Sequence, residues 1–154
     1  MTTVYSRPTA PTITPPVQRD ALRAARRSLD DAITAPAADT QAWATQLLAE
    51  LRKLARVFEK HVRDSESNEG SLPEVLALKP HLQARVGMMM NDHMLLQRHI
   101  DEVIGLTEQQ INSRAVWVES LRLNAGALVD EVRSHQAKGI DLVYEAFNRV
   151  DGFG

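Results

Sequence analysis

The feature that most constrains the fold is an apolar repeat with the spacing of a helix. Between residues 82 and 103 the repeat steps alternately by four and three, which places its members on one face of a helix. They are Leu82, Val86, Met89, His93, Leu96, Ile100 and Val103. Similar repeats occur within residues 22 to 33, 47 to 61 and 121 to 146, and no segment shows the alternation typical of a strand. The sequence therefore predicts four amphipathic helices and an all-α fold.

Short connections separate the predicted helices. The first helix spans residues 17 to about 33 and ends before "APAADT" at 35 to 40, which combines a proline with capping residues. The second is expected from about residue 43 to 64. The connection at 65 to 80 contains glycine and proline and is expected to hold one helical turn, with Pro80 opening the third helix. This organisation is typical of an antiparallel up-down-up-down four-helix bundle.

The chain is expected to form one domain preceded by an arm. Residues 1 to 16 hold four of the seven prolines, interspersed with threonines, and are interpreted as a flexible, extended N-terminal arm. Residues 17 to 154 are assigned to the bundle. A chain of 154 residues that is 44% hydrophobic is large and apolar enough to bury a core.

Composition excludes several classes of function. Eighteen lysines and arginines against 20 acidic residues give a formal net charge of -2, so neither nucleic acid nor a membrane is an expected partner. The local basic cluster Arg23, Arg26 and Arg27 is interpreted as a solvated helix face. No apolar run approaches the roughly 18 residues of a membrane span, and no secretory signal is recognised, so a cytoplasmic location is expected. Without cysteine, metal chemistry must rest on histidine and carboxylates.

Three of the apolar repeats contain a histidine, namely His61, His93 and His135. In an antiparallel helix pair, two residues are level when their numbers average to the midpoint of the connection. His61 and His93 average to 77, which lies within the connection at 65 to 80. His93 and His135 average to 114, which favours a helix break at 112 to 113 over the capping box "TEQQ". The three imidazoles are therefore expected in one layer, with Gln18 level with them on the first helix.

Metal binding is the preferred interpretation of this layer. Neutral imidazole is the commonest metal ligand in proteins, and buried imidazoles without a metal need several hydrogen-bond partners. The alternative is a metal-free core in which each ring is bonded to a carbonyl or carboxylate. A haem held by one of the methionines in "MMM" and one histidine would leave two histidines unexplained. No motif supports enzymatic turnover, so the protein is expected not to be an enzyme.

Three stretches resemble the hemerythrin-like (HHE cation-binding) family, in particular a group of short bacterial members. They are "HVRDSESNEGSLPEVLALKPHL", "NDHMLL" and "SHQAKGIDLVYEAFNRVDGFG", of which the last is the most specific. The resemblance covers residues 17 to 152. It implies a non-haem iron centre that carries or senses dioxygen, handles nitric oxide or senses iron.

The resemblance also implies a set of metal ligands. Carried over by position, they are His61, Glu66, His93, His135 and Asp141. Asp141 follows His135 by six residues, about 120° round an ideal helix, whereas a side chain four residues on would share its face.

Because the sequence departs from the family pattern, it offers fewer metal ligands than most members do. Asp92 and Glu145 match family positions and are expected to support ligands rather than to bind metal. Gln18 stands where many members have a histidine, and Gln97 replaces a second histidine four residues after His93. We therefore expect a site for one or two irons that has fewer protein ligands than is usual in the family, and that binds a small diatomic molecule. The alternative is a metal-free bundle that serves as a structural or protein-interaction module.

Overall fold

The computed structural model describes residues 16 to 148, with side-chain environments given from residue 20 onward. Its helices are α1 (Pro16–Thr34), α2 (Thr40–Glu66), α3 (Ser71–Leu78), the 3-10 turn η1 (Pro80–Leu82), α4 (Gln83–Asn112) and α5 (Val118–Phe147). The described chain contains helices and connections without a strand, so the all-α prediction is confirmed. The predicted arm lies outside the described residues, except for Pro16, which opens α1.

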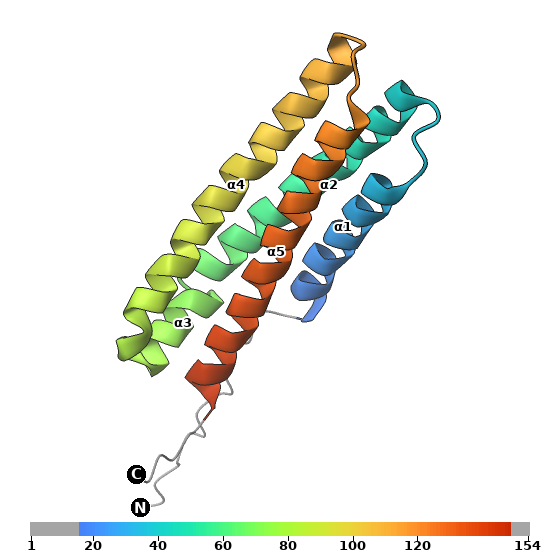
Figure 1. The fold of residues 1–154 in the computed structure, drawn as a ribbon. Helices are drawn as coiled ribbons and strands as arrows, with labels where there is room; N and C mark the ends of the chain where they lie inside the picture. Colours follow the sequence, from blue (N-terminus) through green and yellow to red (C-terminus); the bar gives the residue numbers. More distant parts are fainter. Residues whose placement is uncertain (1–15, 149–154) are drawn as a thin grey trace, which may run out of the picture.

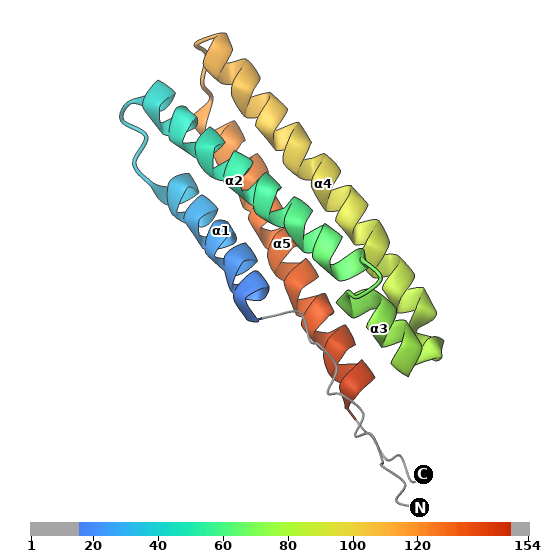
Figure 2. The ribbon, with the colours of Figure 1, turned by 180° about the vertical axis from the view of Figure 1, so that it is seen from behind.

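The four long helices lie side by side as a bundle (Figures 1 and 2). α1 packs on α2 and α5, and α4 packs on the same two helices from the other side. The α1–α2 and α4–α5 connections lie at one end, and α3 lies near the other (Figure 1). α1 has 19 residues and α5 has 30, or about 28 Å against 45 Å of helix. α1 therefore begins part-way along α5.

The connection between α1 and α2 is fixed by side chains that satisfy helix ends. Asp39 caps α2 by accepting a hydrogen bond from the Ala42 backbone N–H at 3.0 Å. The Arg122 guanidinium donates to the carbonyls of Ile33 and Ala35, both at 3.0 Å. These carbonyls at the end of α1 have no partner within the helix. Arg122 thereby ties α5 to this end of α1.

The break between α4 and α5 is the later of the two that the sequence allowed. α4 continues to Asn112, and within it the buried Thr107 donates its hydroxyl to the Val103 carbonyl at 2.7 Å. Gln110 then accepts a hydrogen bond from the Trp117 backbone N–H at 2.8 Å, just before α5. The Trp117 side chain is 68% exposed.

The connection at 65 to 80 is more structured than predicted. Instead of one helical turn it holds α3, an eight-residue helix that buries Leu72 and Val75. Pro80 opens η1 rather than α4 itself. Gly70 makes the approach to α3 possible, because a Cβ there would lie 2.5 Å from the carbonyl oxygens of Asp64 and Ser65.

Two apolar cores fill the bundle, and the histidine positions lie between them. The larger core includes Phe58, Leu96 and Val132. The smaller core, at the α3 end, includes Met89 and Leu142. Along α4 and α5 the histidines fall between members of these two cores. Within the described residues, no helix has the length and apolar character needed to span a membrane.

Replacing Gly70 by alanine should lower the free energy of unfolding by about 1 to 3 kcal/mol, because the added methyl meets backbone atoms that cannot yield easily. Urea denaturation followed by circular dichroism would measure it. Gly105→Ala is the matched control, since nothing lies within 4 Å of the place that its methyl group would take on α4. That variant should gain about 0.5 to 1 kcal/mol. Equal effects of the two substitutions would contradict the packing described for Gly70.

Candidate metal centre

Three imidazoles meet inside the bundle, each from a different helix. His61 comes from α2, His93 from α4 and His135 from α5. One nitrogen from each ring lies within 4.8 Å of the others. The ring centroids are 5.3 Å apart for His61 and His93, 5.4 Å for His61 and His135, and 4.8 Å for His93 and His135. The prediction that the three histidines share one layer is confirmed.

An apolar environment surrounds this histidine cluster. His93 and His135 are 1% and 3% exposed, while His61 is half-buried. Phe58, one turn before His61 on α2, places its ring centroid 5.7 to 6.0 Å from all three imidazoles. It closes the side of the cluster that faces the larger core.

The spacing of two nitrogens suits a common metal ion. His61 Nε2 and His135 Nε2 are 3.3 Å apart. Two ligands with bonds of ~2.1 Å at a tetrahedral angle lie about 3.4 Å apart. The outer limit of 4.8 Å for the whole set exceeds the ~4.2 Å that two such bonds can span. The most widely separated nitrogens would therefore have to move closer before all three could bind one ion.

Glu66, which the resemblance implies as a ligand, contacts a histidine. Its Oε1 lies 3.0 Å from Nδ1 of His93. Because an ionised carboxylate only accepts, a neutral His93 donates from Nδ1 and keeps the lone pair on Nε2. Glu66 can reach the ring because it is the last residue of α2, where the helix ends. A carboxylate in this position orients a metal-binding histidine and raises its basicity.

Burial keeps two of the rings neutral at pH 7. Burial, reinforced by the adjacent His93, lowers the pKa of His61 from 6.5 to about 4. Burial, with His93 and His61 adding to it, lowers the pKa of His135 to about 3. Neutral imidazole is the form that binds metal. His135 Nδ1 is also buried without a hydrogen-bond partner in the described protein, and such orphaned atoms call for a bound ion or water.

The other carboxylates that the resemblance points to lie away from the histidine cluster. Asp141 is exposed on α5 and is not part of the converging set. Asp92 lies 3.6 Å from Lys138, and Glu145 pairs with Arg85, so neither supports a histidine as expected. Gln18 belongs to α1, but its side chain lies outside the described residues.

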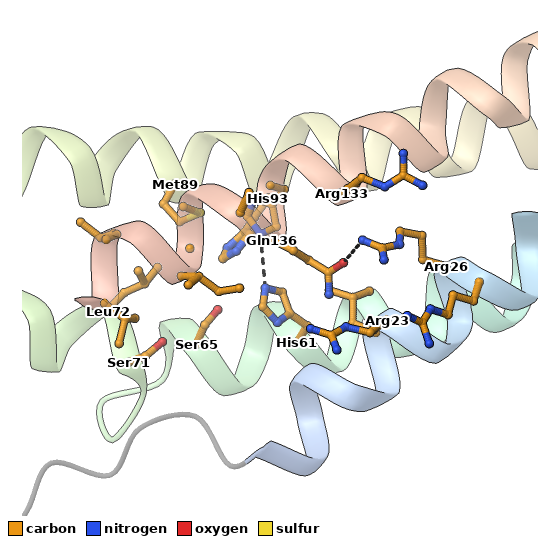
Figure 3. Close-up of a pocket in the computed structure, with 18 residues that line it drawn as sticks. Arg23, Arg26, His61, Ser65, Ser71, Leu72, Met89, His93, Arg133 and Gln136 are labelled. Carbon is orange, nitrogen blue, oxygen red and sulfur yellow. Dashed lines mark hydrogen bonds between the residues drawn. The ribbon is translucent and has the colours of Figure 1, made fainter. Parts of the chain in front are cut away.

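A pocket of about 350 Å³ reaches the histidine cluster from the side of α1 and α5 (Figure 3). Three of its lining arginines belong to the cluster on α1 that the sequence predicts as a solvated face, and Arg23 and Arg27 are exposed as expected. Arg26 is half-buried and donates from Nη1 to Gln136 Oε1 at 2.8 Å. Arg23, Arg26 and Arg27 are three and four residues apart, and this spacing already indicates that they share one face of the helix.

Metal-free protein should lose stability as the pH falls below about 6.5. In the unfolded chain both rings bind protons near pH 6.5, whereas in the folded protein His61 and His135 bind them only near pH 4 and 3. Each ring therefore removes up to about 1.4 kcal/mol of unfolding free energy per pH unit in this window. Denaturation at pH 7, 6 and 5 with chelator present would measure the slope.

Two variants separate this effect from the general titration of carboxylates. In His135→Gln, the unfolding free energy should fall less steeply with decreasing pH, because unfolding takes up nearly one proton fewer. His81→Gln, which changes an exposed histidine in η1, should keep the original slope. If His135→Gln also keeps it, the buried ring does not titrate as described.

Comparison with known proteins gives no assignment: no family model, curated protein or solved structure matches this chain.

Proposed function

We propose that this protein binds one divalent transition-metal ion through His61, His93 and His135. The observation that carries the proposal is the convergence of three imidazoles from three helices in the core. Nitrogen ligands of this kind suit zinc, iron, copper and nickel. Iron is our choice among them because of the resemblance to hemerythrin-like proteins. The role we propose is to bind or sense a small ligand such as dioxygen or nitric oxide.

A single ion fits the described side chains better than a pair. A pair of irons is normally bridged by carboxylates, as the family resemblance implies. Glu66 is instead held by His93 Nδ1, and Asp141 is exposed. The described residues thus offer three nitrogens to one point and no carboxylate that joins them.

The surrounding residues would support such a site in distinct ways. Glu66 holds His93 with its Nε2 free, and Phe58 excludes water from the core side. A metal with three protein ligands keeps a coordination position open for a small molecule. The pocket on the α1 side leads to the histidines. No carboxylate is among the described residues that line this pocket.

One observation favours a second function, in which the layer holds no metal. The 3.3 Å approach of His61 Nε2 and His135 Nε2 can itself be a hydrogen bond, with one ring donating and the other accepting. Glu66 satisfies His93 in the same way. In that case the histidines form a polar layer that sets the alignment of α2, α4 and α5, and the bundle is a structural or interaction module.

Metal loading distinguishes the two functions. Chelator-treated protein, incubated anaerobically with Fe²⁺ and desalted, should retain about one iron per chain by elemental analysis. Because only the folded state binds the ion, free Fe²⁺ at 100 times its Kd adds about 2.7 kcal/mol to the free energy of unfolding and raises Tm by several degrees. His93→Ala should abolish both effects, whereas His81→Ala, at an exposed position, should keep them. Unchanged Tm and no retained iron would favour the metal-free module, and two irons per chain would contradict a single-ion site.

Glu66→Gln should weaken metal binding by about 10- to 100-fold without removing it, because the amide still occupies the place of the carboxylate but orients His93 less strongly. Competition with a colorimetric chelator would give the affinity. Glu69→Gln changes an exposed carboxylate of the same connection and should match the original protein. A loss as complete as that in His93→Ala would show that Glu66 binds the metal directly.

A further inference from the structure

The pocket beside the histidines has two chemically different ends (Figure 3). At one end stand four arginines: Arg23, Arg26 and Arg27 from α1, and Arg133 from α5. At the other end the wall is mainly apolar. Its members there include Leu72, Met89, Leu142 and Val143. The histidine cluster lies between the two ends. A volume of about 350 Å³ is within the range that holds small organic ligands.

The arginine end carries an excess of positive charge, with Arg26 half-buried and the other three arginines exposed. The half-buried Arg26 uses Nη1 to donate to the neutral amide of Gln136. Its pKa is lowered, first by burial and then by Arg133, Arg23 and Arg27, with Asp30 acting in the opposite direction.

The neighbouring acids neutralise this charge only weakly. Arg133 has an exposed contact with Asp130 at 3.4 Å, which faces solvent. None of the described residues that line the pocket is acidic. Arginine remains protonated, so an anion that enters here relieves the mutual repulsion of the guanidinium groups.

We infer that the pocket binds a small amphipathic anion, a monocarboxylate with an unbranched apolar tail. The carboxylate lies at Arg26, whose planar guanidinium can pair with both carboxylate oxygens. The tail passes the histidine cluster and ends against Leu72, Met89 and Leu142. Neither the arginine end nor the apolar end is part of the converging histidine set, so this binding does not require a metal.

Other ligand classes use only part of this pocket. Inorganic phosphate would satisfy the arginines but leave the apolar end without a partner. A neutral apolar molecule would fill that end but leave the guanidinium charges uncompensated. A cationic amphiphile would be repelled by the four arginines. A carboxylate with a hydrocarbon tail matches both ends.

The test is calorimetric titration of the full chain, in chelator at pH 7.5, with butanoate, hexanoate and octanoate. Octanoate should bind one to one, and affinity should rise by up to about fourfold for each buried methylene. Octylammonium should not bind, and phosphate should bind more weakly than octanoate. No octanoate binding at millimolar concentration, or no dependence on tail length, would overturn the proposal.

Variants locate the ligand within the pocket. Arg26→Gln should weaken octanoate binding at least tenfold, and Arg133→Gln should weaken it to a lesser degree. Arg52→Gln removes one positive charge from an exposed ion pair with Glu108 on another face and should change nothing. Ile140→Asn, at a half-exposed apolar lining residue, should weaken octanoate but not butanoate. Thermal unfolding followed by circular dichroism confirms that each variant is folded.

Equal octanoate affinity in Arg26→Gln and Arg52→Gln would overturn the assignment of the carboxylate to Arg26. Because every titration is done without metal, failure here leaves the iron-loading result unaffected. Conversely, a protein that binds octanoate but retains no iron would keep this inference and lose the proposed metal site.

Discussion

The rest of the structure depends on the burial of three imidazoles in a single layer of the bundle. Helical periodicity assigns these positions to the core, where apolar side chains would pack more favourably than a polar ring. Burial removes water from the rings, and water is what stabilises a charged imidazole. His61 and His135 are therefore held in the neutral form. The same desolvation that makes the layer expensive for folding prepares its nitrogen lone pairs for a cation.

The layer divides the apolar core in two, and the two parts pack different helices together. The larger core holds α1, α2, α4 and α5 together along most of the bundle. The smaller one depends on α3, which brings Leu72 and Val75 over the end of α5. Glu66 stands at the junction, where α2 ends and the chain turns toward α3. The position of this carboxylate is thus set by the connection as much as by the helix.

The histidine layer could be predicted from the sequence because it depends on two regular quantities, the helical period and the lengths of the connections. The break at Asn112 followed from the same reasoning and is confirmed. What escaped prediction lies at helix ends and between helices, where no period applies. The sequence predicts one helical turn where α3 stands, and it gives neither the contact of Glu66 with His93 nor that of Arg26 with Gln136. Each of these depends on which neighbour a side chain meets after the helices pack.

The short helix α1 contributes none of the three converging histidines, yet it supplies three of the four arginines at the pocket. Most of the arginines at the pocket and the converging imidazoles are therefore carried by different helices. A sequence change confined to residues 20 to 34 can alter the charge of the pocket while the imidazole set stays intact. In such a bundle, the arginine end of the pocket and the imidazole layer can change independently of each other.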